Sequence, residues 1–324
     1  SNEYGSLPKY SHLTSAFNDK MYYSGPVVDE NEMVAAIHTL LFGNWIAGGG
    51  EVAKFEIEYS KKVNNKHTLM VNSGSSADLI MIAGLKKYLN WNDGDEIIIS
   101  VVGFPTTLSS LTINRLKPVF VDIEMDTLNF DLNLIEEKLK IKDNKIKGIF
   151  ISPVLANAPD FDRLIEFKNK YNIELILDGC DSLGTKWNGK ELNEYCIATS
   201  GSMYSAHHIS VGQGGTISSN DSELIKICRS IATWGKKCDC VGKQNLLTNG
   251  KCGTRFCNWI PEHPDLILDH RYVFDHEGYN LIPLDLQGSM GLEQLKKLDF
   301  IIENRKKHKD IVEKLVLENI NGLK

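Results

Sequence analysis

The chain has 324 residues, of which 42% are hydrophobic and 24% are charged, proportions that are ordinary for a globular protein and argue against disorder. Its formal net charge of −6 disfavours the phosphate backbone of a nucleic acid as the main partner, although local loops and helix ends can still bind a small anionic substrate. The sequence contains no run of about 18 apolar residues and no signal-peptide pattern. We therefore expect a cytoplasmic protein without a membrane partner.

Short apolar stretches alternate with amphipathic stretches through most of the chain. Strands are expected at residues 96–101, 118–122, 148–152, 174–177, 197–200 and 215–218, and a further short apolar run covers residues 68–71. Helices are expected at residues 30–42, 52–63, 77–89, 106–115, 132–140, 161–171, 221–233, 284–298 and 301–317. Because short apolar strands separated by helices form parallel sheets with both faces covered, the pattern predicts an α/β fold.

The start of the helix that follows the apolar run at residues 68–71 is a candidate phosphate site. Small hydroxyl residues and glycine occur there, and the candidate contacts are Gly74, Ser75 and Ser76. Such a helix start offers backbone N–H groups and the positive end of the helix dipole to a phosphate. On its own the signal is weak, because the same residues commonly serve as plain helix caps.

Residues that follow later strands add to this candidate site. Phe104 comes just after a strand, where it could stack on a flat ring or pack in the core. Asp178 ends another strand, and a carboxylate at that edge of a sheet can keep a pyridine nitrogen protonated, although a simple cap is more common. Ser202 could add a hydroxyl to the phosphate contacts. His207 follows in the same loop, and its imidazole can move protons near neutral pH.

This order of residues resembles the DegT/DnrJ/EryC1/StrS family of nucleotide-sugar aminotransferases, from about residue 35 to the end of the chain. The resemblance implies the α/β large domain of fold type I pyridoxal phosphate (PLP)-dependent transferases, with a mostly parallel mixed seven-stranded sheet, in a homodimer. It also implies that Asp178 pairs with the pyridinium, that Phe104 stacks on the ring, and that Ser76 and Ser202 bind the phosphate.

Two further positions are assigned through this resemblance. Asn280, within Gly278-Tyr279-Asn280-Leu281, matches an asparagine that reaches the phosphate of the neighbouring subunit. The aminotransferases carry glutamine where this chain has Asp181. Asp181 is therefore a candidate coenzyme contact at which the chain departs from the family pattern.

His207 occupies the position of the lysine that forms the Schiff base in the aminotransferases. Imidazole cannot form a stable imine, so the coenzyme would be held without a covalent bond. A histidine here, in Ala206-His207-His208-Ile209, resembles the family's 4-keto-6-deoxyhexose 3-dehydratases. These enzymes use pyridoxamine phosphate (PMP) to remove the C3 hydroxyl of a nucleotide-linked sugar. The resemblance implies a C–O lyase in which His207 is the catalytic base.

The cysteines are unevenly distributed, and five of the seven lie between residues 228 and 257. In a cytosolic chain this crowding indicates metal or redox chemistry more often than disulfides. Four thiolates suit a [2Fe–2S] cluster, whereas zinc ligands usually come in pairs two to four residues apart. The expected ligands are Cys180, Cys238, Cys240 and Cys252, with Cys257 as the alternative to Cys252. Cys196 and Cys228 are expected to be packing residues.

The cysteine spacing resembles the iron–sulfur branch of the 3-dehydratases. That branch implies a CDP-linked substrate, 3,6-dideoxyhexose synthesis, and electrons from a separate flavin/iron–sulfur reductase. We divide the chain into an N-terminal segment with a helix (1–50), a coenzyme-binding α/β domain (51–234), a cysteine-rich cluster loop (235–275), and helices that lead to a largely absent C-terminal domain (276–324). The alternatives are a cluster-free dehydratase–transaminase, a sugar aminotransferase, and a catalytically silent homologue that binds a nucleotide sugar or a metal.

Overall fold

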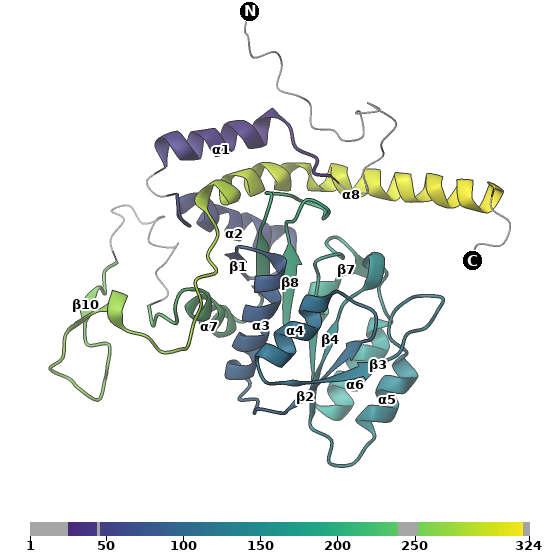
Figure 1. The fold of residues 1–324 in the computed structure, drawn as a ribbon, viewed down its shortest axis with the longest axis horizontal. Coiled ribbons are helices and arrows are strands. Elements are labelled where there is room, and N and C mark those ends of the chain that lie inside the picture. Colours follow the sequence, from purple (N-terminus) through teal and green to yellow (C-terminus); the bar gives the residue numbers. More distant parts are fainter. Residues whose placement is uncertain (1–24, 44–45, 239–251, 320–324) are drawn as a thin grey trace, which may run out of the picture.

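The structure, a computed structural model, describes residues 25–43, 46–238 and 252–319 (Figure 1). Its centre is a seven-stranded sheet in the order β1-β9-β8-β5-β4-β2-β3. The strands are β1 (His67–Val71), β2 (Glu96–Ser100), β3 (Lys117–Val121), β4 (Ile146–Ile151), β5 (Glu174–Asp178), β8 (Ala198–Ser202) and β9 (Gly215–Ser219). β9 runs antiparallel to both of its neighbours, and the other pairs are parallel. The predicted mixed, mostly parallel sheet is confirmed.

Helices cover both faces of the sheet, because consecutive strand residues are apolar and alternate between two cores. In β2, Ile97 and Ile99 pack with α3 (Gly74–Tyr88), α4 (Pro105–Ile113) and α7 (Ser222–Ala232). Ile98 points to the opposite face, with α5 (Leu132–Leu139) and α6 (Phe161–Tyr171). All three isoleucines are at most 2% exposed. This double burial explains why the strands appear as continuous apolar runs in the sequence.

Three further helices form a layer over one edge of the sheet: α1 (Glu30–Phe42), α2 (Gly50–Lys62) and α8 (Asp285–Asn319). The long α8 packs along both α1 and α2 (Figure 1). The prediction of two separate helices at 284–298 and 301–317 was wrong. Leu298 and Ile301 are both buried, and neither proline nor glycine lies between them, so the helix continues.

The described part of the segment between α7 and α8 extends away from the sheet on the left of Figure 1. It contains a short antiparallel pair, β10 (Phe256–Cys257) and β11 (Leu268–Asp269). Isolated bridges join Thr233 to Asn280 and Lys236 to Phe274 at its base. Within the described ranges, no helix combines the length and the apolar character needed to cross a bilayer.

Candidate active site

The start of α3 meets the end of β8 and the turn after β5. Ser73 caps the helix, since the backbone N–H of Ser76 donates to its Oγ atom at 3.1 Å. A Cβ atom added to Gly74 would lie 2.7 Å from the Cβ atom of Ser202 and 3.1 Å from the Sγ atom of Cys180. Only glycine therefore fits between these groups. The first N–H groups of a helix have no partner within it, so this site suits a phosphate.

Asp178 stands at the carboxyl end of β5 and is buried. The hydroxyl of Thr107 donates to its Oδ2 atom at 2.7 Å. A second buried carboxyl, that of Asp78 on α3, accepts a hydrogen bond of 2.6 Å from Ser200. Burial, followed by the nearby charge of Asp178, raises the pKa of Asp78 well above its usual value.

Sequence reasoning did not identify Asp78 as part of this site. The available signal was a carboxylate between Ala77 and Ile80 on a helix that is otherwise buried there. Charged residues are rarely buried without a specific partner. That partner, Asp178, is 100 positions away, so only the folded structure brings the two carboxyls together.

The side chains of His207 and Asp181 face one another. The Nδ1 atom of His207 lies 3.2 Å from the Oδ1 atom of Asp181. The hydrogen bond from His207 lowers the pKa of Asp181, so the carboxylate stays charged at neutral pH. The His207 side chain is 19% exposed, which leaves part of the ring accessible. Asp181 thus contacts the candidate base, a role that the sequence did not reveal.

The neighbouring His208 is in a different environment. Its Nδ1 atom is buried and has no hydrogen-bond partner among the described residues. Burial lowers the pKa of His208 to about 4, and the positive charge of Arg305 adds to this effect. His208 is therefore neutral near pH 7, and among the described residues the ion-pair contact with a carboxylate is made by His207.

Helix α8 holds the loop that carries His207. The guanidinium of Arg305 donates to the carbonyl oxygens of His207 and Ala206 at 2.9 and 3.1 Å. The fully buried amide of Gln294 accepts a hydrogen bond of 2.9 Å from the backbone N–H of Ser210. Neither α8 residue could be identified from the sequence, because no local pattern links them to a loop some 84 to 99 positions earlier.

The remaining predicted coenzyme contacts lie at the surface. Phe104 is the N-cap of α4, three residues before Thr107, and is 66% exposed. The core interpretation of Phe104 is therefore wrong, and its ring is accessible for stacking. Ser75 and Asn280 are also exposed. Asn280 pairs with Thr233 near the end of β1, and its contact with a neighbouring subunit remains a prediction.

The structure brings together only part of the predicted cysteine set. Cys180 lies beside Gly74, and burial and the nearby carboxylates raise the pKa of its thiol well above the usual value. Cys238 and Cys252 instead gather with His270 in the segment after α7, their ligand atoms all within 4.8 Å of one another. The thiol of Cys257 donates to a backbone carbonyl at 2.9 Å. Cys240 lies outside the described residues.

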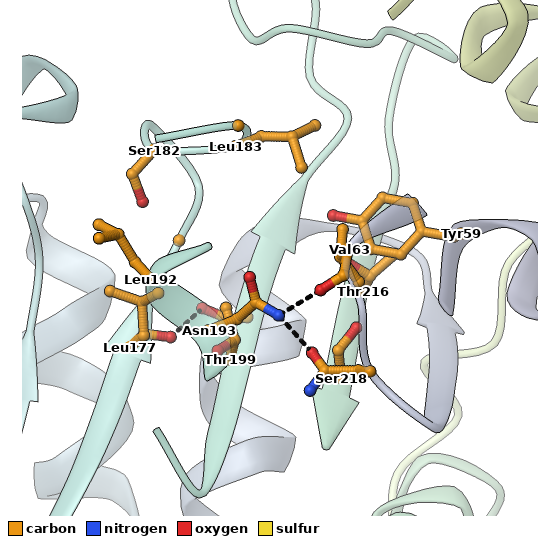
Figure 2. A pocket seen from close by; sticks show the side chains of 14 residues that line it. Tyr59, Val63, Leu177, Ser182, Leu183, Leu192, Asn193, Thr199, Thr216 and Ser218 are labelled. Carbon is orange, nitrogen blue, oxygen red and sulfur yellow. Dashed lines mark hydrogen bonds between the residues drawn. The ribbon is translucent and has the colours of Figure 1, made fainter. Parts of the chain in front are cut away.

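A separate pocket lies between the sheet and α2 (Figure 2). Asn193 projects into its centre and donates to the Val63 carbonyl and to the Asn65 side chain. The buried hydroxyls of Ser182 and Thr199 have no hydrogen-bond partner among the described residues. None of the predicted site residues lines this pocket, so we assign it no role in coenzyme binding.

Comparisons with known proteins show which family the chain resembles. The sequence profile of the DegT/DnrJ/EryC1/StrS aminotransferase family matches residues 27–323. The lipopolysaccharide biosynthesis protein RfbH of Salmonella typhimurium is 35% identical over 288 residues, which cover 87% of this chain and 64% of that protein. The GDP-4-keto-6-deoxy-D-mannose 3-dehydratase of Yersinia pseudotuberculosis is 32% identical, with 89% of this chain and 69% of that enzyme covered.

The solved structures include the E. coli GDP-4-keto-6-deoxy-D-mannose-3-dehydratase with bound hydrated PLP. It superposes with a TM-score of 0.78 at 30% identity, covering 91% of this chain and 72% of that one. The chain spans less than two thirds of the Salmonella relative's length. On the profile match and these identities, the chain belongs to the DegT/DnrJ/EryC1/StrS aminotransferase family.

Proposed function

We propose that this chain forms the coenzyme-binding part of a PMP-dependent 3-dehydratase. Its substrate would be a nucleotide-linked 4-keto-6-deoxyhexose. The resemblance of the cysteine spacing favours CDP as the nucleotide. The product would lead to 3,6-dideoxysugars of the lipopolysaccharide O-antigen. Relatives named as 3-dehydratases of nucleotide-linked deoxysugars support the reaction class. The observation that carries the proposal is a histidine, paired with a carboxylate, at the position of the family's imine-forming lysine.

The residues around Gly74 fit the coenzyme. The space that a Cβ atom would fill at this position, beside Ser202 and the start of α3, suits a phosphate group. Asp178 would hold the pyridine nitrogen, and Phe104 would cover the ring. When bound, PMP supplies an amine that reacts with a sugar ketone and a ring that withdraws electrons.

His207 would move the proton in this reaction. Because Asp181 engages the Nδ1 atom, proton exchange falls to the Nε2 atom of the imidazole. The Asp181 carboxylate orients the ring through this contact. Arg305 keeps the loop that carries the base in place through the carbonyls of His207 and Ala206. Because no lysine occupies this position, no side-chain amine there competes with the free amine form of the coenzyme.

The proposal includes an iron–sulfur centre in the cysteine-rich segment, a separate flavin/iron–sulfur reductase as the source of electrons, and a homodimer. The proximity of Cys238 and Cys252 supports a metal in this segment. Cys180 lies beside Gly74 and is not a member of that group, and Cys240 lies outside the described residues. We therefore derive no chemical step through the cluster.

Reversible dehydration in labelled water tests the proposal without a reductase. The chain is incubated with PMP, a CDP-4-keto-6-deoxyhexose and oxygen-18 water, and the sugar is analysed by mass spectrometry. We expect the label at C3, because a hydroxyl that leaves can be replaced by solvent. An unlabelled C3 together with an aminated sugar, formed when an amino donor is added, would instead identify an aminotransferase.

A further inference from the structure

A buried carboxylate lies on α1, the helix that packs along α8 (Figure 1). Glu32 is 0% exposed, whereas the apolar Val34 and Ile37 of the same helix are each more than half exposed. Replacing a buried ion pair by apolar residues is often neutral or stabilising, so a buried charge is poor evidence for a packing role. The contacts of Glu32 therefore need a different explanation.

The carboxylate of Glu32 is fully hydrogen-bonded. Its Oε1 atom accepts from the Nε2 atom of Gln294 at 2.8 Å, and its Oε2 atom accepts from the backbone N–H of Asp29 at 2.9 Å. The ammonium of Lys297 donates to both oxygens at 2.7 and 2.8 Å. Gln294 and Lys297 are three residues apart and so lie on one face of α8. Each oxygen thus accepts two hydrogen bonds, and the negative charge has a cationic partner.

These contacts determine which way the amide of Gln294 points. Its Nε2 atom donates to the Glu32 carboxylate and to the carbonyl oxygen of Val27, both at 2.8 Å, and both partners can only accept. Its Oε1 atom accepts from the backbone N–H of Ser210 at 2.9 Å, which can only donate. A rotated amide would oppose donors to a donor and oxygen to oxygens. Glu32 therefore holds the Oε1 atom towards Ser210.

Ser210 belongs to the loop of the candidate base, three residues after His207. It is buried, so its N–H needs an acceptor within the protein. Arg305, which donates to the carbonyl of His207, follows Gln294 by about three helical turns and so projects from the same side of α8. The loop is thus attached to α8 at two points, and one of them depends on Glu32.

We infer that Glu32 is a positioning residue for His207. By fixing the amide of Gln294, it makes α1 part of the support of the loop that carries the base. The inference rests on the proposed function for the role of His207, whereas the effect of Glu32 on the loop does not. Among the described residues Glu32 reaches the loop through Gln294, so its effect should disappear when that link is rebuilt by other side chains.

Glu32→Gln tests the link, because the new amide has the same size but cannot satisfy both neighbours. One of its orientations opposes the NH2 group of Gln294, and the other opposes the N–H of Asp29. Hydrogen–deuterium exchange of the full chain without coenzyme, followed by mass spectrometry, reports on residues 203–214. We expect roughly tenfold faster exchange there, as for the loss of one buried hydrogen bond. Glu30→Gln, exposed on the same helix, should match the wild type.

The double variant Glu32→Gln/Gln294→Glu separates orientation from packing. The new amide at position 32 can donate to the new carboxylate at position 294, whose other oxygen can still accept from Ser210, although the contact with Val27 is lost. Exchange in the loop should return to within about threefold of the wild type, because the two positions are coupled. If Glu32 served only to pack α1 on α8, the double variant would exchange at least as fast as the single one.

Three results of the exchange experiment would overturn the inference. They are a wild-type rate in Glu32→Gln, a double variant without recovery, and equal acceleration across α1, α8 and the loop, which would show general loosening. Circular dichroism confirms that each variant is folded.

Exchange of the methylene protons of bound PMP tests the consequence for the base. Glu32→Gln should slow it at least roughly threefold, with unchanged affinity for PMP and recovery in the double variant. An unchanged methylene rate in a variant with a loosened loop would overturn the positioning role. If the wild type shows no methylene exchange while the loop responds as expected, the proposed function fails and the link from Glu32 to the loop stands.

Discussion

The imidazole of His207 and the carboxylate of Asp181 form a pair 3.2 Å apart, joining the loop after β8 to the turn after β5. The carboxylate is the more exposed partner, with 62% of its side chain accessible. Its pKa is lowered by the hydrogen bond from His207, so the interaction is present above the unfolded pKa of about 3.9 and is lost as pH falls through the lower folded value. The pair is intact at the pH values at which a histidine base works.

Asp181→Asn should slow proton exchange at the methylene of bound PMP by roughly tenfold. Hydrogen bonds to charged groups contribute about 1.5–3 kcal/mol, and the exposure of this carboxylate places it at the lower end. Deuterium exchange followed by NMR across pH 6–9 measures the effect, with Asp126→Asn as an exposed control. An unchanged rate would show that Asp181 does not assist His207.

His207→Asn should abolish this exchange while PMP remains bound. Asparagine is similar in size but cannot accept a proton near neutral pH, and general acid–base groups typically contribute about 100- to 10,000-fold. His208→Asn is the matched comparison, because burial keeps His208 neutral. Loss of exchange in the second variant alone would transfer the base role to His208.

Much of the fold could be predicted from the sequence, because its signals are local. The central strands are short apolar runs, and all seven lie within one or two residues of the expected bounds. The candidate phosphate site could be predicted for the same reason, since Gly74 and Ser202 each lie at the end of a helix or strand that the sequence pattern indicates. The sequence did not predict that α8 is one continuous helix, because the many charged residues on its surface obscure the buried positions that include Leu298 and Ile301.

The residues that sequence reasoning missed act through elements distant in the chain. Asp78 matters because α3 places it against β5, and Arg305 because α8 crosses the loop of His207. His270 has no spacing relationship to the cysteines, and only the hairpin of β10 and β11 brings it to Cys252. Such contacts depend on tertiary packing, which local patterns do not encode.

Gly74→Ala should disrupt PMP binding. The new methyl group would lie 2.7 Å from the Cβ atom of Ser202, and overpacking of this kind costs about 1–3 kcal/mol. Gly50→Ala is a matched control, because Gly50 also begins a helix and an added Cβ atom there meets nothing within 4 Å. Absorbance titration with PMP should show at least roughly tenfold weaker binding for the first variant only. Equal affinities would remove the start of α3 from the phosphate site.

Asp78→Asn should change how stability depends on pH. The raised pKa of Asp78 means that, from about pH 4 upward, the folded protein binds more protons than the unfolded chain. Wild-type stability should therefore decline relative to the variant as pH rises towards the folded pKa. Urea unfolding between pH 4.5 and 8 measures this difference, and Asp126→Asn should follow the wild type. Parallel curves for wild type and Asp78→Asn would show that Asp78 is not protonated in the folded protein.

Arg305→Gln should loosen the loop that carries His207 without altering the coenzyme contacts. Two hydrogen bonds to backbone carbonyls are lost at a solvent-accessible position, so the expected effect is about 1 kcal/mol, or roughly a fivefold slower methylene exchange. PMP affinity should stay the same, because Arg305 contacts neither Gly74 nor Asp178 in any hydrogen bond that the structure describes. Lys307→Gln, an exposed neighbour on α8, is the control. Faster proteolysis between residues 203 and 214 in Arg305→Gln alone would locate the loss in this loop, whereas a parallel drop in PMP affinity would contradict the assignment of Arg305 as a positioning residue.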